Sequence, residues 1–165
     1  MDLFVHGDGT ARFANRSLRC ALGRSGVSVA KHEGDGATPL GAFPCRLLYW
    51  RADRLSLPAT SLPAIALSTA DGWCDDPDDP AYNHPVRLPY TASAESLWRQ
   101  DGVYDLIVPL GYNDAPVVPR RGSAIFLHIA KPGYAPTDGC VALARDDLLE
   151  FLKTATRSSR VVIMP

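Results

Sequence analysis

Thirteen glycines and fourteen prolines are spread along the 165 residues of this chain, and they limit the length of every regular element that it can form. Both residues interrupt helices and strands, so the segments between them are short, as in a β-rich fold. Most of these segments alternate apolar and polar residues or carry β-branched runs, which predicts strands. The expected strands cover residues 2–5, 10–13, 17–22, 42–51, 64–67, 104–109, 124–129 and 160–164. We therefore predict a mainly β fold.

Helix is expected in only two places, at residues 94–99 and 145–153. In the second segment, Phe151 and the neighbouring leucines form an apolar stripe at helical spacing. Residues 71–89 are polar and rich in Asp and Pro, which predicts a long surface loop. No repeat, low-complexity tract or linker interrupts the sequence, and its length suits a single domain spanning residues 1–165.

The charge pattern excludes one class of partner. Seventeen basic and eighteen acidic residues give a net charge of −1, without a basic block, so the electrostatic footprint of a nucleic-acid-binding protein is missing. No run of eighteen apolar residues predicts a membrane segment. Residues 1–9 lack the basic and apolar parts of an export signal, so we expect a cytoplasmic protein, or a periplasmic one if a leader has been trimmed away.

Two loop motifs resemble ligand sites but lack the residues that such sites need. The glycine-rich stretch at residues 34–41 is followed by Ala42 and Phe43, where a phosphate-binding P-loop carries Lys and Ser or Thr. The acidic run at residues 75–79 lacks the Gly and the Glu of a calcium-binding loop. We expect no metal and no organic cofactor.

The four cysteines differ in their surroundings. They form no C-x-x-C pair and are expected to be free thiols. Cys20 and Cys45 alternate with apolar residues in predicted strands, which favours a place in the core. Cys74 precedes two aspartates, whose charge disfavours a thiolate. Cys140 follows Gly139 at a strand-to-helix junction, where backbone amides can face an oxyanion, so it is the candidate nucleophile.

A cysteine nucleophile needs a base, and His128 is the candidate. Alternation along residues 124–130 places Ile125, Leu127 and Ile129 on one face of the strand and His128 on the other, away from the aliphatic core. His6, His32 and His84 lie in turns or the polar loop, where a solvated histidine is expected. The residues alone leave an alternative open, in which Cys140 is a structural cysteine beside a hydrogen-bonded histidine.

Two ordered motifs connect the chain to a known family. Gly-Ser-Ala-Ile-Phe-Leu-His ends at His128, and Thr-Asp-Gly-Cys-Val-Ala-Leu spans residues 137–143 before a leucine-rich helix. Upstream, Lys31 precedes Gly-Asp-Gly-Ala-Thr-Pro-Leu-Gly at residues 34–41. Together these segments resemble the YkuD-type L,D-transpeptidase catalytic domain.

The resemblance implies a β-sandwich of mixed sheets with one or two short helices and a cysteine acyl-enzyme mechanism. Cys140 would be the nucleophile, His128 the base, oriented by a backbone carbonyl, and the amides of Gly139 and Cys140 the oxyanion hole. The bond attacked would join an L-centred diamino acid to the terminal D-Ala of a peptidoglycan stem peptide. Asp138 and Ala142 depart from the family motif, which usually has His and then Arg or Asn at these positions.

The resemblance leaves three functions open. We expect hydrolysis of the terminal D-Ala by an L,D-carboxypeptidase of peptidoglycan recycling; the alternatives are a transpeptidase that forms 3–3 cross-links and a non-catalytic muropeptide-binding module. Carbapenems are expected to acylate the nucleophile, and the oligomeric state is not predicted. Besides the nucleophile and base, residues expected to contact stem peptides or muropeptides are Thr137, Asp138, Tyr112, Asn113 and Tyr134, with Lys31, Arg24 and Arg87 as candidates for the D-Ala carboxylate.

Overall fold

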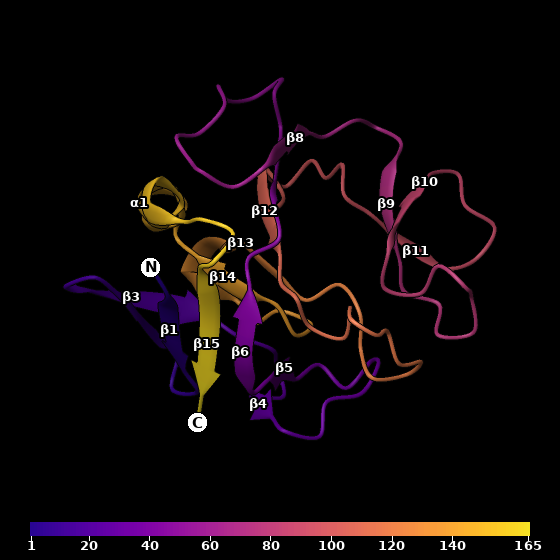
Figure 1. The fold of residues 1–165 in the computed structure, drawn as a ribbon, viewed down its shortest axis with the longest axis horizontal. Helices are drawn as coiled ribbons and strands as arrows, with labels where there is room; N and C mark the ends of the chain where they lie inside the picture. The colour runs from indigo at the N-terminus through magenta and orange to yellow at the C-terminus, as the bar shows by residue number, and fades with distance from the viewer.

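A computed structural model describes all of residues 1–165, and it is built mostly of strands with one short α-helix (Figure 1). Ten strands form one mixed sheet in the order β6-β15-β1-β2-β3-β14-β13-β12-β7-β8. They are β1 (Leu3–His6), β2 (Thr10–Phe13), β3 (Arg16–Ala21), β6 (Gly41–Pro44), β7 (Leu48–Trp50), β8 (Ala64–Ala66), β12 (Leu106–Pro109), β13 (Phe126–Ile129), β14 (Val141–Leu143) and β15 (Arg160–Met164).

The large sheet turns back on itself. A β-bridge between Cys45 and Leu110 brings the end of β6 next to the end of β12, although six strands separate these two in the sheet order. Three neighbouring pairs are parallel, namely β1 with β15, β7 with β8 and β13 with β14. The two halves of the sheet therefore face each other across a shared core, in agreement with the expected sandwich of mixed sheets.

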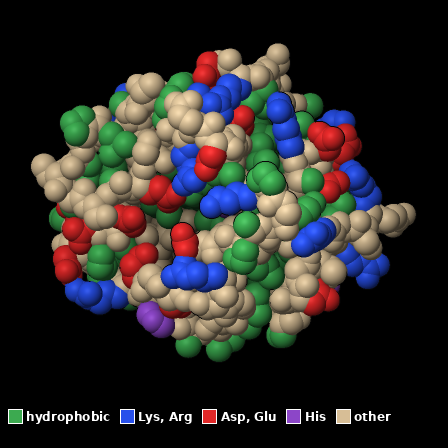
Figure 2. Space-filling view, turned by 180° about the vertical axis from the view of Figure 1, so that it is seen from behind, with side chains coloured by type: hydrophobic (Ala, Val, Ile, Leu, Met, Phe, Trp, Pro, Cys, Tyr) green, Lys and Arg blue, Asp and Glu red, His purple; other side chains and the backbone are tan.

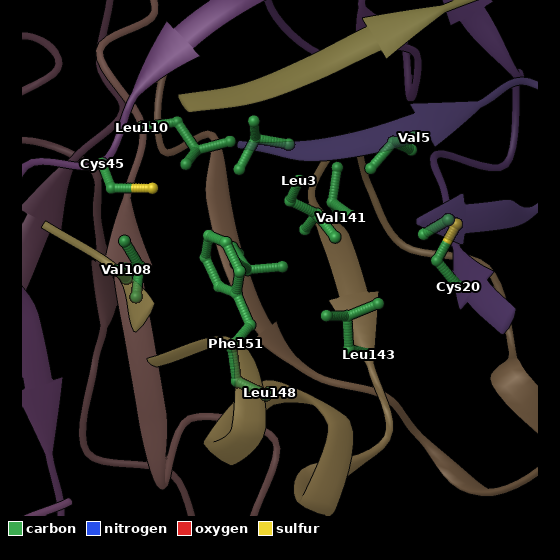
Figure 3. Packing of buried hydrophobic residues seen from close by; sticks show 14 of the residues in the cluster. Leu3, Val5, Cys20, Cys45, Val108, Leu110, Val141, Leu143, Leu148 and Phe151 are labelled. Atoms are coloured by element: carbon green, nitrogen blue, oxygen red, sulfur yellow. The ribbon is translucent and has the colours of Figure 1, made fainter. Parts of the chain in front are cut away.

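The core lies between the sheet halves and helix α1 (Arg145–Thr154). Figure 3 shows Phe151 and Leu148 of α1 pointing toward Leu3 of β1 and toward the apolar residues of β14. Phe151 is fully buried and packs edge-on against Phe13, with 5.7 Å between the ring centroids. Helix α1 covers the hydrophobic core because its apolar stripe, predicted for residues 145–153, faces inward.

A three-stranded sheet beside the large one corrects two predictions. It consists of β9 (Asp71–Cys74), β10 (Pro85–Arg87) and β11 (Ala94–Ser96), in the order β10-β9-β11, and lies to the right in Figure 1. The helix expected at residues 94–99 is wrong because Ala94–Ser96 instead pairs antiparallel with β9, and so short a helix is marginal without packing. The loop expected at residues 71–89 is confined to the turn between β9 and β10.

The remaining elements follow the sequence prediction closely. Strands β2 and β15 have the expected bounds, whereas residues 42–51 divide into β6 and β7 because these pair with different partners, β15 and β12. A small parallel pair, β4 (Val27–Ser28) and β5 (Thr38–Pro39), was not predicted, and a 3-10 turn, η1, covers Pro132–Tyr134. All four cysteines are free, as expected, and all four are buried, as was expected of Cys20 and Cys45. No helix is both long and apolar enough to cross a membrane.

Candidate active site

The parallel pairing of β13 and β14 brings the two candidate catalytic side chains together. Leu127 pairs with Val141 and His128 with Ala142, so Cys140, directly before β14, lies beside Phe126. The N–H of Phe126 donates to the Cys140 sulfur at 3.3 Å. Since side chains two residues apart along a strand share a face, His128 and Cys140 lie on the same face of the sheet. That face is opposite to the one that buries Leu127, as the alternation predicts.

Both side chains line one cavity of about 390 Å³, which we call the Cys140 cavity. Its walls come from β13, the segment before β14, strand β11 and the turn that follows it, and the segments around Glu33 and Asp75. The site therefore lies where the large sheet meets the three-stranded sheet.

His128 is held as a neutral base. Its Nδ1 lies 2.9 Å from the carbonyl oxygen of Ile129, so Nδ1–H donates there and Nε2 remains an acceptor. The Tyr104 ring packs edge-on against the imidazole, with centroids 5.2 Å apart. Burial lowers the pKa of His128 from 6.5 to about 4 because the charged form is poorly solvated there. The orienting group is a backbone carbonyl, as the family resemblance implies.

The Cys140 thiol is also neutral at rest. Its sulfur donates to the carbonyl oxygen of Ala124 at 3.2 Å, and the structure shows no hydrogen bond between this sulfur and His128. Burial, reinforced by the nearby Glu95 carboxylate, raises the pKa of the thiol from 9.0 to about 12. A preformed thiolate–imidazolium pair is therefore disfavoured, and the proton has to move when substrate is bound.

The two sequence motifs meet at Cys140. The hydroxyl of Thr137 donates to the Cys140 carbonyl at 2.7 Å, and that of Thr38, from the upstream motif, approaches the same oxygen at 3.5 Å. Gly139 has φ +136°, and a Cβ there would lie 2.8 Å from the carbonyl oxygen of Ala37. The Thr-Pro-Leu-Gly segment thus supports the loop that carries the nucleophile, and this loop requires glycine at position 139.

The expected oxyanion hole is only partly available. The Gly139 N–H donates to the Thr137 hydroxyl at 3.1 Å, so in the resting structure it is already used within the loop. The N–H of Cys140 makes no hydrogen bond within the protein. Cys140 rather than Gly139 therefore offers the free amide next to the sulfur.

Only two of the predicted substrate-binding residues, Thr137 and Asp138, line the Cys140 cavity. Asp138 is 93% exposed and forms an ion pair with Arg24, which lies outside the lining, and its negative charge contributes to the raised pKa of the Cys140 thiol. Tyr134 also lies outside the lining, where its ring stacks under the guanidinium of Arg19.

The other candidates for the carboxylate and stem peptide lie elsewhere. Lys31, Tyr112 and Asn113 line a separate hollow, and the buried Lys31 ammonium is neutralised by Asp35 at 2.5 Å. Arg87 lies at a third hollow and pairs with Asp71. These four residues therefore do not line the Cys140 cavity. Sequence proximity suggested Tyr112 and Asn113, whereas Lys31 and Arg87 were candidates because of their positive charge.

Sequence reasoning missed the two cations that do line the cavity, Arg99 and Lys131. Arg99 pairs with Asp101 at 2.5 Å and lies over the Tyr104 ring, whereas Lys131 occurs in none of the ion pairs of the structure. Glu95 was also missed because its segment was expected to be helical; its carboxylate accepts a hydrogen bond from the Tyr104 hydroxyl at 2.5 Å. Lys131 lies three residues after His128, just beyond the end of the predicted strand, and that position was an available signal.

One known protein family matches almost the whole chain. The L,D-transpeptidase catalytic domain family, YkuD, matches residues 2–163. No curated protein matches the chain. Among solved structures, the chain is similar to L,D-transpeptidase 1 of Mycobacterium tuberculosis, with 11% sequence identity and a TM-score of 0.43 over 99% of this chain. The chain spans 61% of the length of that protein.

Proposed function

The chain belongs to the L,D-transpeptidase catalytic domain family, and from this membership we propose that it removes the terminal D-Ala of peptidoglycan tetrapeptide stems by way of a Cys140 thioester. The observation that carries the proposal is the position of Cys140 and His128 on one face of the paired strands, lining a single cavity. Membership supports a cysteine-dependent reaction on peptidoglycan peptides. That water rather than a second peptide accepts the acyl group is proposed in addition.

Acylation begins from the neutral pair. When substrate displaces the thiol from the Ala124 carbonyl, Nε2 of His128 accepts the thiol proton while the sulfur attacks the carbonyl carbon before D-Ala. The free N–H of Cys140 stabilises the oxygen on which negative charge develops. The imidazolium then donates its proton to the D-Ala nitrogen, the C–N bond breaks, and a thioester joins the tripeptide to Cys140.

Deacylation uses the same base with water. His128 takes a proton from a water molecule whose oxygen attacks the thioester carbonyl, and the proton returns to sulfur as the C–S bond breaks. The products are the tripeptide and a restored thiol, so no redox partner or metal is required. Because the imidazole is neutral down to a pH near 4, it can act as a base throughout the physiological range.

The cations of the Cys140 cavity suit a substrate with a free C-terminal carboxylate. Lys131 has no ion pair, and Arg99 has one guanidinium face over Tyr104 while pairing with Asp101. A carboxypeptidase has to bind the carboxylate of the residue that it releases, and a cation near the leaving group does so. We therefore assign this role to Lys131, with Arg99 beside it.

The shape of the surface favours water over a second peptide as the acceptor. The Cys140 cavity, at about 390 Å³, is near the small end of ligand sites. The hollows of about 120 and 510 Å³ share no lining residue with it, so neither of them extends the Cys140 cavity into a second binding site. An acceptor stem has to be held in place to compete with water.

The test uses a defined disaccharide tetrapeptide and the mass of its products. Wild-type protein is expected to yield the tripeptide and free D-Ala, and Cys140→Ala and His128→Gln are expected to lose this activity by a factor of at least about 1,000. A cross-linked dimer as the main product would instead establish the transpeptidase alternative. Turnover that survives in Cys140→Ala would refute both enzymatic proposals and leave a muropeptide-binding module.

A further inference from the structure

Asn83 makes an unusual set of contacts for a surface-turn residue. It lies in the turn between β9 and β10, is only 5% exposed and has φ +58°. Its Oδ1 accepts hydrogen bonds from the Trp73 indole and from the N–H of Ala124, both at 3.0 Å. Its Nδ2 donates to the carbonyls of Tyr112 at 3.1 Å and Asn113 at 2.8 Å. Every polar group of the side chain therefore has a partner.

Ala124 connects this side chain to the nucleophile. Its N–H donates to Asn83, and its carbonyl oxygen accepts the Cys140 thiol at 3.2 Å. Ala124 has φ +53°, a left-handed conformation that is unfavourable for a residue with a Cβ. Such a conformation persists where surrounding contacts enforce it. Asn83 makes the side-chain contact that enforces it here.

We propose that Asn83 is a positioning residue for the Cys140 thiol, acting through the left-handed backbone of Ala124. The proposal rests on the cysteine chemistry proposed above. By fixing Ala124, Asn83 sets the direction of the carbonyl that holds the thiol and thus the position from which the sulfur moves to the substrate. Phe126, the other hydrogen-bond partner of the sulfur, is fixed independently because it pairs with Pro109 in the large sheet.

Two different effects follow from removing the Asn83 side chain. The thiol loses a defined starting position, and a displacement of about 1 Å can lower turnover by a factor of about 100. At the same time the neutral thiol loses its acceptor, while the Phe126 N–H still stabilises a thiolate. The cysteine should therefore react more readily with a small alkylating agent and less well with substrate.

The decisive variants are Asn83→Gly and Asn83→Asp. Asn83→Gly keeps the φ +58° backbone and removes every side-chain contact. It should lower kcat by a factor of about 10 to 100 with KM unchanged, and it should raise the rate of Cys140 alkylation by iodoacetamide at pH 8 about tenfold. If Asn83→Gly does not fold, Asn83→Ser has the same expected effects, since its side chain is too short to reach Ala124.

Asn83→Asp is the matched control. It keeps the oxygen that accepts from Ala124 and loses both donations by Nδ2, so its melting temperature should fall while kcat stays within about threefold of wild type. The inference is overturned if Asn83→Gly turns over like wild type, or if Asn83→Asp loses as much kcat as Asn83→Gly. If wild type does not turn over the tetrapeptide, the proposed function fails, and unchanged alkylation in Asn83→Gly would then overturn the role of Asn83 separately.

Discussion

At the scale of single residues, the site is organised around keeping two reactive groups uncharged. Burial lowers the pKa of His128 to about 4 and raises that of Cys140 to about 12. Neither group carries a charge at neutral pH, so the protein does not have to solvate an ion pair inside the fold. The cost is that the proton has to be transferred during acylation, which makes the relative position of sulfur and imidazole decisive.

The depressed pKa of His128 predicts a pH dependence of stability. Between pH 6.5 and pH 4 the unfolded chain binds a proton at His128 that the folded chain does not, so the free energy of unfolding falls as the pH is lowered. The full difference is about 3 kcal/mol and is present below pH 4. Urea unfolding at pH 7 and pH 4.5 should therefore show a smaller loss for His128→Gln than for wild type. Equal losses would show that His128 is not buried in its neutral form.

Lys131 provides a test of how the leaving residue is recognised. Replacing it with Met keeps the length of the side chain and removes the charge, so KM for the tetrapeptide should rise about tenfold. With a substrate whose terminal D-Ala carboxylate is amidated, Lys131→Met and wild type should have the same KM. Lys153→Met, which removes an exposed charge on α1, is the control. A rise in KM that is equal for both substrates would exclude contact with the carboxylate.

At the scale of elements, α1 contributes buried side chains to the core of the large sheet. Phe151→Ala removes a fully buried ring with which α1 packs against β1 and β14. The substitution should lower the free energy of unfolding by about 3–5 kcal/mol. Leu149, which is only partly buried on the same helix, is the matched position, and Leu149→Ala should cost clearly less. Denaturant unfolding measures both. Similar losses at the two positions would place the core on a different face of α1.

The elements also show where sequence reasoning was sufficient. Apolar alternation is a local property, so it placed β13 with its aliphatic face inward and His128 on the other face. The same local alternation predicted strand β15, which follows α1 in the chain. The short strand β11 has only three residues and depends on pairing with β9, which no local pattern reports. Glu95 and Arg99 were missed for that reason.

At the scale of the whole molecule, the site depends on segments that are far apart in the sequence. The turn that holds Asn83, the strand of His128 and the loop of Cys140 meet only because the three-stranded sheet packs beside the large one. Local sequence patterns also cannot predict that strands from the two ends of the chain pair, as β1 does with β15. The candidate carboxylate-binding residues Lys31, Arg24 and Arg87, which were chosen for their positive charge, consequently do not line the Cys140 cavity.

The charged side chains on one face of the molecule are of mixed sign. On the face shown in Figure 2, acidic and basic side chains are interspersed rather than gathered into one patch. Long-range steering of a highly charged polymer needs a field of one sign, so this face offers none. The recognition proposed here is local to the Cys140 cavity.

The central claim is that Cys140 is a nucleophile activated by His128, and covalent trapping with a carbapenem tests it most directly. Intact-protein mass spectrometry should show one added drug molecule on wild type and none on Cys140→Ala, with the Cys140 peptide carrying the adduct. His128→Gln should acylate much more slowly. A wild-type protein that stays unmodified, or an adduct that persists in Cys140→Ala, would contradict the account.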